Sequence, residues 1–409
     1  MIKKLQTKML LPACFAATML TANAQTGLHF DGVDDYVQGT TIPVSGNGAR
    51  TIEAWIRTTK DSNGNQSVIC DWGHSSTWTT GNRFTFNILW SNTLRLEVAG
   101  GGINGNTAVN DGLWHHVAVT FNNSATYKVK LYVDGVLDAE GNMGNNPTVN
   151  TATNTKLRLG MRVDGVNLFE GDMDEVRVWD YALTEAELQS RMNVELCGDE
   201  AGLVAYFPLT EGTPGVDNTG ITTTSDMSPT NDTGTLNNFA LTGDTSNWVE
   251  GHGLVSLSET TLTAAQTGAT YQWVDCDNDN AVLDGATAQT FTPEASGNYA
   301  VEITVDGCVT TSGCMAVEVE SLGVEDTLFA NNLKVYPNPT SGNVKVILNG
   351  VYETVDAQLV SITGKVVAQY QFSNTNEFAI DLNNINSGLY FLNLKADQLD
   401  AATVKVVKM

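Results

Sequence analysis

Four carboxylate side chains lie close together in the string E-G-D-M-D-E at residues 170–175. Side chains at positions i and i+2 of a β-strand point to one face, so Glu170 and Asp172 are expected on the same side of a sheet. Two carboxylates about 5 Å apart can act as nucleophile and general acid in the hydrolysis of a glycosidic bond. The spacing therefore allows a glycoside hydrolase that uses Glu170 and Glu175.

Aromatic side chains gather in a second candidate region that is rich in Gly, Ser, Thr and Asn. Trp72, His74, Trp78 and Trp90 fall in or beside its polar loops. An exposed aromatic face can stack on a sugar ring while Asn and Asp bond the hydroxyl groups. We therefore predict Trp72, His74 and Trp78 as ligand-binding residues, with packing inside the loops as the alternative for the two tryptophans.

Short runs of alternating apolar residues must position these groups. They begin at residues 27–37 and continue at 51–56, 113–121, 130–135 and 171–179, separated by clusters of Asn, Gly, Asp and Thr. A period of two residues is typical of strands with one buried face. Many short strands with polar turns predict an all-β protein whose first half consists of two antiparallel sheets packed face to face.

The same runs carry a family resemblance. The strings F-D-G at 30–32, T-I-E-A-W at 51–55, W-H-H-V-A at 114–118, Y-V-D-G at 132–135 and D-E-V-R-V-W at 174–179 follow one another in this order. In that order they resemble the laminin G-like, concanavalin A-like jelly-roll family. The resemblance implies a jelly-roll sandwich, a fold that hosts lectins, adhesive modules and some glycosidases, so it leaves the ligand open.

The resemblance also implies a metal site. Proteins of this family often hold Ca²⁺ near the edge of the sandwich, and the corresponding positions are Asp31 and Asp174, with Asp34 and Asp35 as further ligands. Ca²⁺ takes about six to eight oxygen ligands, so backbone carbonyls and water must complete the shell. The alternative is a turn in which Asp31 and Asp35 bond their own backbone.

The resemblance argues against catalysis. The string at 170–175 also fits the E-x-D-x-x-E spacing of laminarinase-like glycosidases. The other strands fit the non-catalytic branch of the fold, and the aromatic pattern that lines the groove of the glycosidases is not evident. We therefore expect no enzyme activity.

Composition and charge restrict the partners. The chain has 409 residues and a formal net charge of −25, and residues 25–333 hold 12 basic and 40 acidic side chains. A field of this sign repels phosphate groups, which argues against nucleic acid and anionic membrane surfaces as partners.

The first residues predict export. Lys3, Lys4 and Lys8 precede an apolar run at 9–20, and A-N-A follows at 22–24. This is the layout of a secretory signal peptide covering residues 1–24. No later stretch has the roughly 18 apolar residues that a transmembrane helix needs.

Export also permits disulfides. With Cys14 in the leader, an odd number of cysteines remains, so at least one thiol is expected to stay free or to pair with another chain. Cys276, Cys308 and Cys314 lie in one later stretch. We expect a bridge among these three rather than one to Cys70.

Changes of sequence texture divide the rest of the chain. We predict the laminin G-like jelly roll at 25–193, a partial laminin G-like appendage at 194–252 and a linker at 322–332. Residues 253–321 contain Y-Q-W-V and, later, G-N-Y-A-V, which resemble two strands of an immunoglobulin-like sandwich. Such modules are usually spacers.

The last block, residues 333–409, carries a second specific resemblance. Y-P-N-P at 336–339, I-T-G-K at 362–365 and S-G-L-Y-F at 387–391 resemble the type A C-terminal sorting domain of the type IX secretion system. We expect this block to fold as a small antiparallel β-sandwich, and the resemblance implies the type IX machinery as a partner. It also implies a mature protein that is secreted, or attached to surface lipopolysaccharide, on the outside of a Gram-negative bacterium.

These observations together predict an exported, non-catalytic binding protein of the adhesin or carbohydrate-binding type. Its partner would be a glycan or a surface protein. A glycoside hydrolase that uses Glu170 and Glu175, and a structural matrix component, remain the alternatives.

Overall fold

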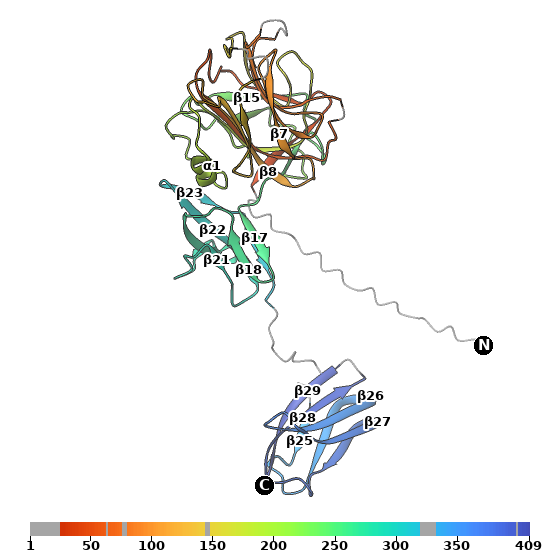
Figure 1. The fold of residues 1–409 in the computed structure, drawn as a ribbon. Coiled ribbons are helices and arrows are strands. Elements are labelled where there is room, and N and C mark those ends of the chain that lie inside the picture. The colour runs from red at the N-terminus through yellow and green to blue at the C-terminus, as the bar shows by residue number, and fades with distance from the viewer. Residues whose placement is uncertain (1–24, 63, 76–79, 144–147, 320–332, 398–399) are drawn as a thin grey trace, which may run out of the picture. The chain divides into compact units, whose positions relative to one another are not determined.

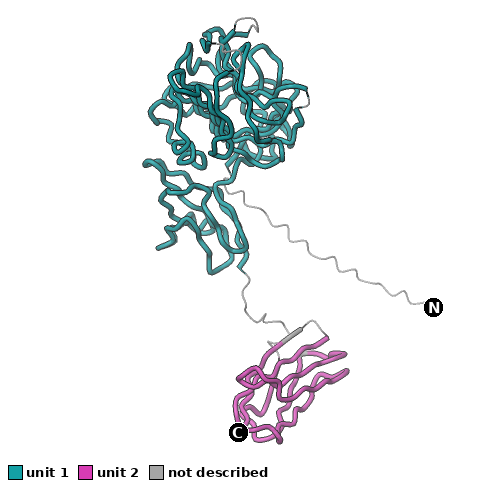
Figure 2. Tube along the Cα trace, in the orientation of Figure 1, with its two compact units in different colours: residues 1–319 teal, residues 320–409 magenta. Residues whose placement is uncertain are grey.

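The computed structural model describes residues 25–62, 64–75, 80–143, 148–319, 333–397 and 400–409. The chain divides into two compact units, residues 1–319 and residues 320–409 (Figures 1 and 2). Both are built mainly of β-strands, as the alternating runs predict. The predicted leader and linker lie outside the described residues.

Sheet A, the first of two large sheets in unit 1, runs in the order β10-β9-β8-β3-β12-β1-β16, with β13 paired to β12. All its neighbouring strands are antiparallel. Its strands are β1 (Thr26–Asp31), β3 (Arg50–Arg57), β8 (Trp114–Phe121), β9 (Val129–Val133), β10 (Val136–Gly141), β12 (Glu170–Trp179), β13 (Leu203–Phe207) and β16 (Trp248–Glu250).

Sheet B is also antiparallel and runs in the order β14-β15-β2-β11-β4-β5-β6-β7. Its strands are β2 (Tyr36–Gln38), β4 (Ser67–Gly73), β5 (Arg83–Ile88), β6 (Thr93–Glu97), β7 (Gly102–Ala108), β11 (Thr155–Leu159), β14 (Thr223–Ser225) and β15 (Thr233–Asn237). The strands from residues 194–252, predicted as an appendage, therefore pair directly with both large sheets.

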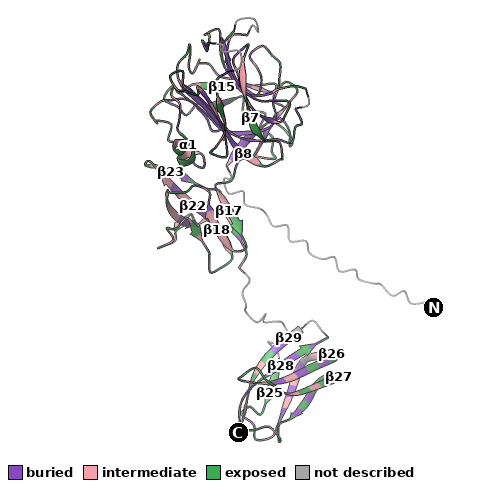
Figure 3. Ribbon diagram, in the orientation of Figure 1, coloured by how far each residue is buried: buried purple, intermediate pink, exposed green. Residues whose placement is uncertain are grey.

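The inner faces of sheets A and B enclose the main hydrophobic core. Leu28 and Phe30 of β1 and Phe84 of β5 are fully buried in it (Figure 3). Because neighbouring residues of a strand point to opposite faces, burial of Leu28 and Phe30 turns His29 outward. The predicted two-layer jelly roll is confirmed.

The helix α1 (Glu185–Arg191) covers one part of the outer face of sheet A. Thr184 starts it with a capping box, in which its side chain accepts the N–H of Glu187 and the Glu187 side chain accepts the N–H of Thr184. Leu188 packs with Trp179 and Tyr206 in a second, smaller cluster of buried side chains. The helix thus buries the outer face near the end of β12.

A small module follows the jelly roll within unit 1. Trp273 is fully buried between its two sheets and stacks on Phe291 at 5.4 Å between ring centroids, which agrees with the predicted immunoglobulin-like sandwich. One sheet contains β17 (Val255–Ser258), β18 (Thr261–Ala264) and β21 (Thr290–Phe291), and the other β19 (Thr270–Asp275), β20 (Ala281–Val282), β22 (Gly297–Val305), β23 (Cys308–Thr311) and β24 (Met315–Val317), with the 3-10 turn η1 (Cys276–Asn278).

Two disulfides stabilise this part of the chain. Cys276 is bonded to Cys314 inside the small module, as expected, and Cys308 is bonded to Cys197 beside the jelly roll. Cys70 is a free, buried thiol in the main core. The second bridge ties the module to the jelly roll, a pairing that the sequence does not predict.

Unit 2 is one antiparallel sheet with its own core. Val346, Leu359 and Leu392 are buried together in it. Its strands are β25 (Lys334–Tyr336), β26 (Asn343–Ser361), β27 (Val366–Asp381), β28 (Gly388–Ala396) and β29 (Asp400–Lys408). The predicted C-terminal β-domain is thus confirmed.

Candidate functional site

An acidic loop lies at the edge of the sandwich where β1 ends. Asp31 Oδ1 accepts the backbone N–H groups of Val33 and Asp34 at 2.8 and 3.3 Å. Gly32 makes the turn with φ of +73°, and a Cβ added there would lie 2.7 Å from Cβ of Glu170. The loop therefore packs tightly against the first residue of β12.

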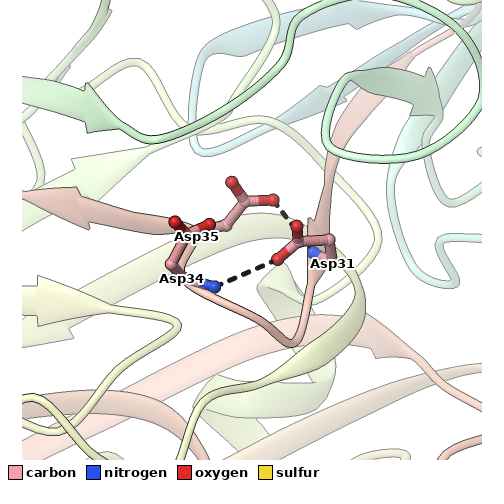
Figure 4. A group of neighbouring side chains, drawn as sticks. All are labelled: Asp31, Asp34 and Asp35. Atoms are coloured by element: carbon pink, nitrogen blue, oxygen red, sulfur yellow. Dashed lines mark hydrogen bonds between the residues drawn. The ribbon is translucent and has the colours of Figure 1, made fainter.

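Asp31, Asp34 and Asp35 bring their carboxylates together in this loop (Figure 4). One oxygen from each lies within 4.8 Å of the others. Asp35 is buried, accepts the N–H of Asp31 and the Ser246 hydroxyl at 2.9 and 3.0 Å, and has its pKa raised to about 6 by burial. Grouped carboxylate oxygens are ligands that Ca²⁺ prefers, although the Asp31 turn also satisfies the loop's backbone.

Asp174 lies away from this loop, so the prediction that Asp31 and Asp174 share one ion is wrong. The register of β1 and β12 pairs Leu28 with Met173 and Asp31 with Glu170, which separates the two aspartates along the strands. Asp174 is instead buried against His252, whose backbone N–H and Nδ1 lie 3.0 and 2.8 Å from Asp174 Oδ2. Burial raises the pKa of Asp174.

The carboxylates at 170–175 separate into two environments. Glu170 and Asp172 point to one face, as predicted, and line a cleft of about 280 Å³ together with His29, Arg57 and residues 58–60. The cleft lies on the outer face of sheet A, at the end that the α1 cluster leaves open. Gly112 and Gly171 complete its lining.

Glu175 does not reach this cleft. The register of β12 against β3 shifts between Asp174 and Arg177, and Glu175 takes φ of +53° there. Its carboxylate is buried against Arg177 and the Tyr206 hydroxyl, and burial raises its pKa to about 7. Glu170 and Glu175 are therefore not a pair that could act on one bond.

Opposite charges are paired throughout the cleft. Asp172 lies 2.6 Å from His29 Nδ1 and 2.6 Å from Arg57 Nε, and Glu170 lies 2.5 Å from Lys60 Nζ. The Thr58 hydroxyl donates to the Glu170 carbonyl at 2.7 Å. The site is consequently a polar surface with donors and acceptors at fixed positions.

An aromatic ring packs against one of the residues that line the cleft. The Arg57 guanidinium lies 4.9 Å from the ring centroid of Trp114, which is half-buried. The sequence does not predict His29, Arg57 or Lys60 as site residues. The outward position of His29 and Arg57 in their strands is a usable signal, but only the strand order β3-β12-β1 brings them together.

The structure describes two of the three predicted ligand-binding residues, Trp72 and His74. Trp72 is fully buried and its indole N–H donates to the Val44 carbonyl at 2.7 Å, so it cannot stack on a ligand. His74 is half-buried, and its backbone N–H donates to the Asn82 carbonyl at 3.1 Å. Trp78 lies outside the described residues. Trp90 is 56% exposed after β5.

A two-layer sandwich with an open polar cleft defines a lectin-type β-sandwich protein with an appended C-terminal β-domain. Residues 31–189 match the concanavalin A-like lectin/glucanases superfamily, and residues 334–409 match the secretion system C-terminal sorting domain. The first half is thus a laminin G-like domain. The type IX sorting domain directs the protein to the cell surface or outside the cell. Among the described residues, no helix is long and apolar enough to cross a membrane.

Solved structures with similar folds include a protein from Bacteroides ovatus proposed to bind carbohydrate, with 21% identity and a TM-score of 0.41 over 53% of this chain and 58% of that one. A heptameric SAP-like pentraxin from Limulus polyphemus has 16% identity and a TM-score of 0.32 over 41% and 81%. The CBM40 of Ruminococcus gnavus IT-sialidase has 17% identity and a TM-score of 0.33 over 41% and 97%. The chain therefore spans little more than half of the Bacteroides protein.

Proposed function

We propose that this protein is an exported, non-catalytic glycan-binding protein of the cell surface or its surroundings. The observation that carries the proposal is the open cleft, whose lining holds paired charged groups and whose Arg57 packs against the ring of Trp114. Sugar hydroxyls both donate and accept hydrogen bonds, and glycan sites offer both kinds of partner next to an apolar surface. The lectin-type fold and the sorting domain support the same class of function.

Pairing of the carboxylates supports binding over catalysis. Asp172 lies beside Arg57 and His29, and Glu170 lies beside Lys60, so each carboxylate already has a partner within the cleft. A general acid needs a carboxyl group that keeps its proton near neutral pH. Glu175 has such a raised pKa, but it is buried away from the cleft.

We further propose that Asp31, Asp34 and Asp35 hold a Ca²⁺ ion that fixes the loop against Glu170. Three carboxylate oxygens within 4.8 Å of one another support this assignment. The expected result is a calorimetric Ca²⁺ signal that Asp34→Asn weakens at least about tenfold, since one charged ligand is lost. Unchanged Ca²⁺ binding by this variant would rule the site out.

A glycan array followed by calorimetry on the full chain tests the main function. Binding to at least one polysaccharide is expected, and Arg57→Ala should weaken it by about 1.5–3 kcal/mol, the range for hydrogen bonds to charged groups. Lys130→Ala, on the β9–β10 hairpin, is the control. The proposal fails if no polysaccharide binds, or if both variants behave alike.

A glycoside hydrolase is the second candidate, because Glu170 and Asp172 share the cleft. It predicts reducing-sugar release from a polysaccharide that the protein binds, and loss of that release in Glu170→Gln. Binding without any release would exclude it.

A further inference from the structure

We infer that the cleft on sheet A selects neutral, hydroxyl-rich sugars and discriminates against acidic ones. The inference rests on the proposed glycan-binding function and names the class of ligand for the same site. It follows from the ion pairs that the charged side chains of the cleft already form with one another.

The lysine and the arginine that line the cleft are each paired with a carboxylate. Lys60 is paired with Glu170 and Arg57 with Asp172, which also lies 2.6 Å from His29 Nδ1. A uronic acid or another acidic sugar would therefore reach only cations that already lie beside a carboxylate. That neighbouring carboxylate would face the ligand's own negative charge, an arrangement that costs affinity.

The surroundings add to this bias. Asp31 is the strand partner of Glu170, and it belongs to the triad with Asp34 and Asp35. The chain as a whole carries a formal net charge of −25. An acidic polysaccharide therefore approaches a field of its own sign, which lowers both its local concentration and its rate of association.

A neutral sugar meets the opposite situation. Among the described residues, the Arg57 guanidinium donates a hydrogen bond only from Nε, and the Glu170 carboxylate accepts one only at Oε2. The remaining guanidinium N–H groups and Glu170 Oε1 are thus available as donors and an acceptor, a combination that hydroxyl groups satisfy. Glu170 and Asp172 are two residues apart on β12, about 6.6 Å along the strand, so both ion pairs can contact one sugar unit or two adjacent ones.

The site is also rigid before any ligand arrives. Arg57 is held between Asp172 at 2.6 Å and the ring of Trp114 at 4.9 Å. A donor whose position is already fixed loses little entropy on binding. Rigidity keeps the ion pairs closed, which favours ligands that do not require them to open.

Competition between two matched polymers tests the inference. Calorimetry on the full chain, at fixed salt and calcium, compares a neutral polysaccharide that the protein binds with the same polymer oxidised to the acid at C6. The oxidised form is expected to bind at least about tenfold more weakly. Equal or tighter binding of the oxidised form would overturn the inference while leaving glycan binding intact. If neither this polymer nor any other binds, the proposed function itself fails.

Glu170→Gln supplies the second measurement. It removes one negative charge and frees Lys60, so the preference for the neutral polymer should fall by at least about threefold. Glu140→Gln is the matched control, because the Lys130–Glu140 pair has side chains 40% and 34% exposed, against 47% and 40% for Lys60–Glu170. A preference that is the same in both variants would contradict the role assigned to the ion pair. Circular dichroism establishes that both variants are folded.

Discussion

Asp71 offers a sharp test of the electrostatics of the fold. It is fully buried on β4, where it accepts hydrogen bonds from the Thr85 hydroxyl and the Val163 N–H, both at 2.8 Å. Burial raises its pKa from 3.8 to about 7, despite the opposing effect of Arg83. A pKa shift of this size means that folding favours the neutral form over the charged form by about 4 kcal/mol of free energy.

The sign of the pH dependence follows from this shift. The unfolded chain releases the Asp71 proton near pH 4, whereas the folded chain keeps it to about pH 7. The stabilising contribution is therefore fully present below pH 4 and is lost as the pH rises to 7. Each pH unit within this window should lower the free energy of unfolding by up to about 1.4 kcal/mol through this group alone.

Asp71→Asn removes this dependence because the amide has no charge to lose. The variant is expected to be less stable than the wild type at pH 5, since its amide cannot accept both hydrogen bonds. The difference in the free energy of unfolding should close towards pH 7. Urea unfolding followed by tryptophan fluorescence measures this difference. All eight tryptophans precede residue 320, so the signal reports unit 1. Asp244→Asn, on an exposed loop, is the control. Stability curves of wild type and Asp71→Asn that run parallel between pH 4.5 and about 7 would refute the reasoning.

Three further substitutions probe the site and its supports. Trp114→Ala removes the ring against which Arg57 packs, and calorimetry should show about tenfold weaker glycan binding; unchanged affinity would show that this ring does not support the site. Cys197→Ser opens the bridge to Cys308, which closes a separation of 111 residues, and non-reducing urea unfolding should show a loss of about 2–4 kcal/mol. Gly32→Ala forces a Cβ against Glu170 at positive φ; it should cost about 1–3 kcal/mol and weaken glycan binding, and full stability with full binding would contradict the close packing described.

The sandwich was predictable because alternation reports directly on burial. In β1 the buried Leu28 and Phe30 alternate with the partly exposed His29 and Asp31, and at the end of β3 the buried Ile56 lies between partly exposed neighbours. One sequence does not reveal which strands lie side by side or in which register. The contact of His29 and Arg57 with Asp172 depends on both, so the cleft could not be assembled from the sequence.

Two site predictions were wrong for a related reason. Trp72 lies on β4, where all seven residues are buried, because Val163 and its neighbours cover the outer face of sheet B. A strand buried on both faces loses the alternation that separates core from surface. The family resemblance predicts that Asp174 and Asp31 bind one metal ion. The β1–β12 register instead sets Asp174 beside Gly27, close to His252.

The cleft lies where other parts of the chain no longer cover the outer face of sheet A. Strand β12 lies in the middle of sheet A. From Asp174 onward its outward-facing polar side chains are buried with His252, Tyr206 and the α1 cluster. Burying charged groups requires partners inside the protein, which is why Glu175 is tied to Arg177. Glu170 precedes this covering and is partly exposed to solvent, whereas Asp172 is buried beside the partly exposed His29 and Arg57. One strand thus carries a closed structural network at one end and an open recognition surface at the other, and only the open end is available to a ligand.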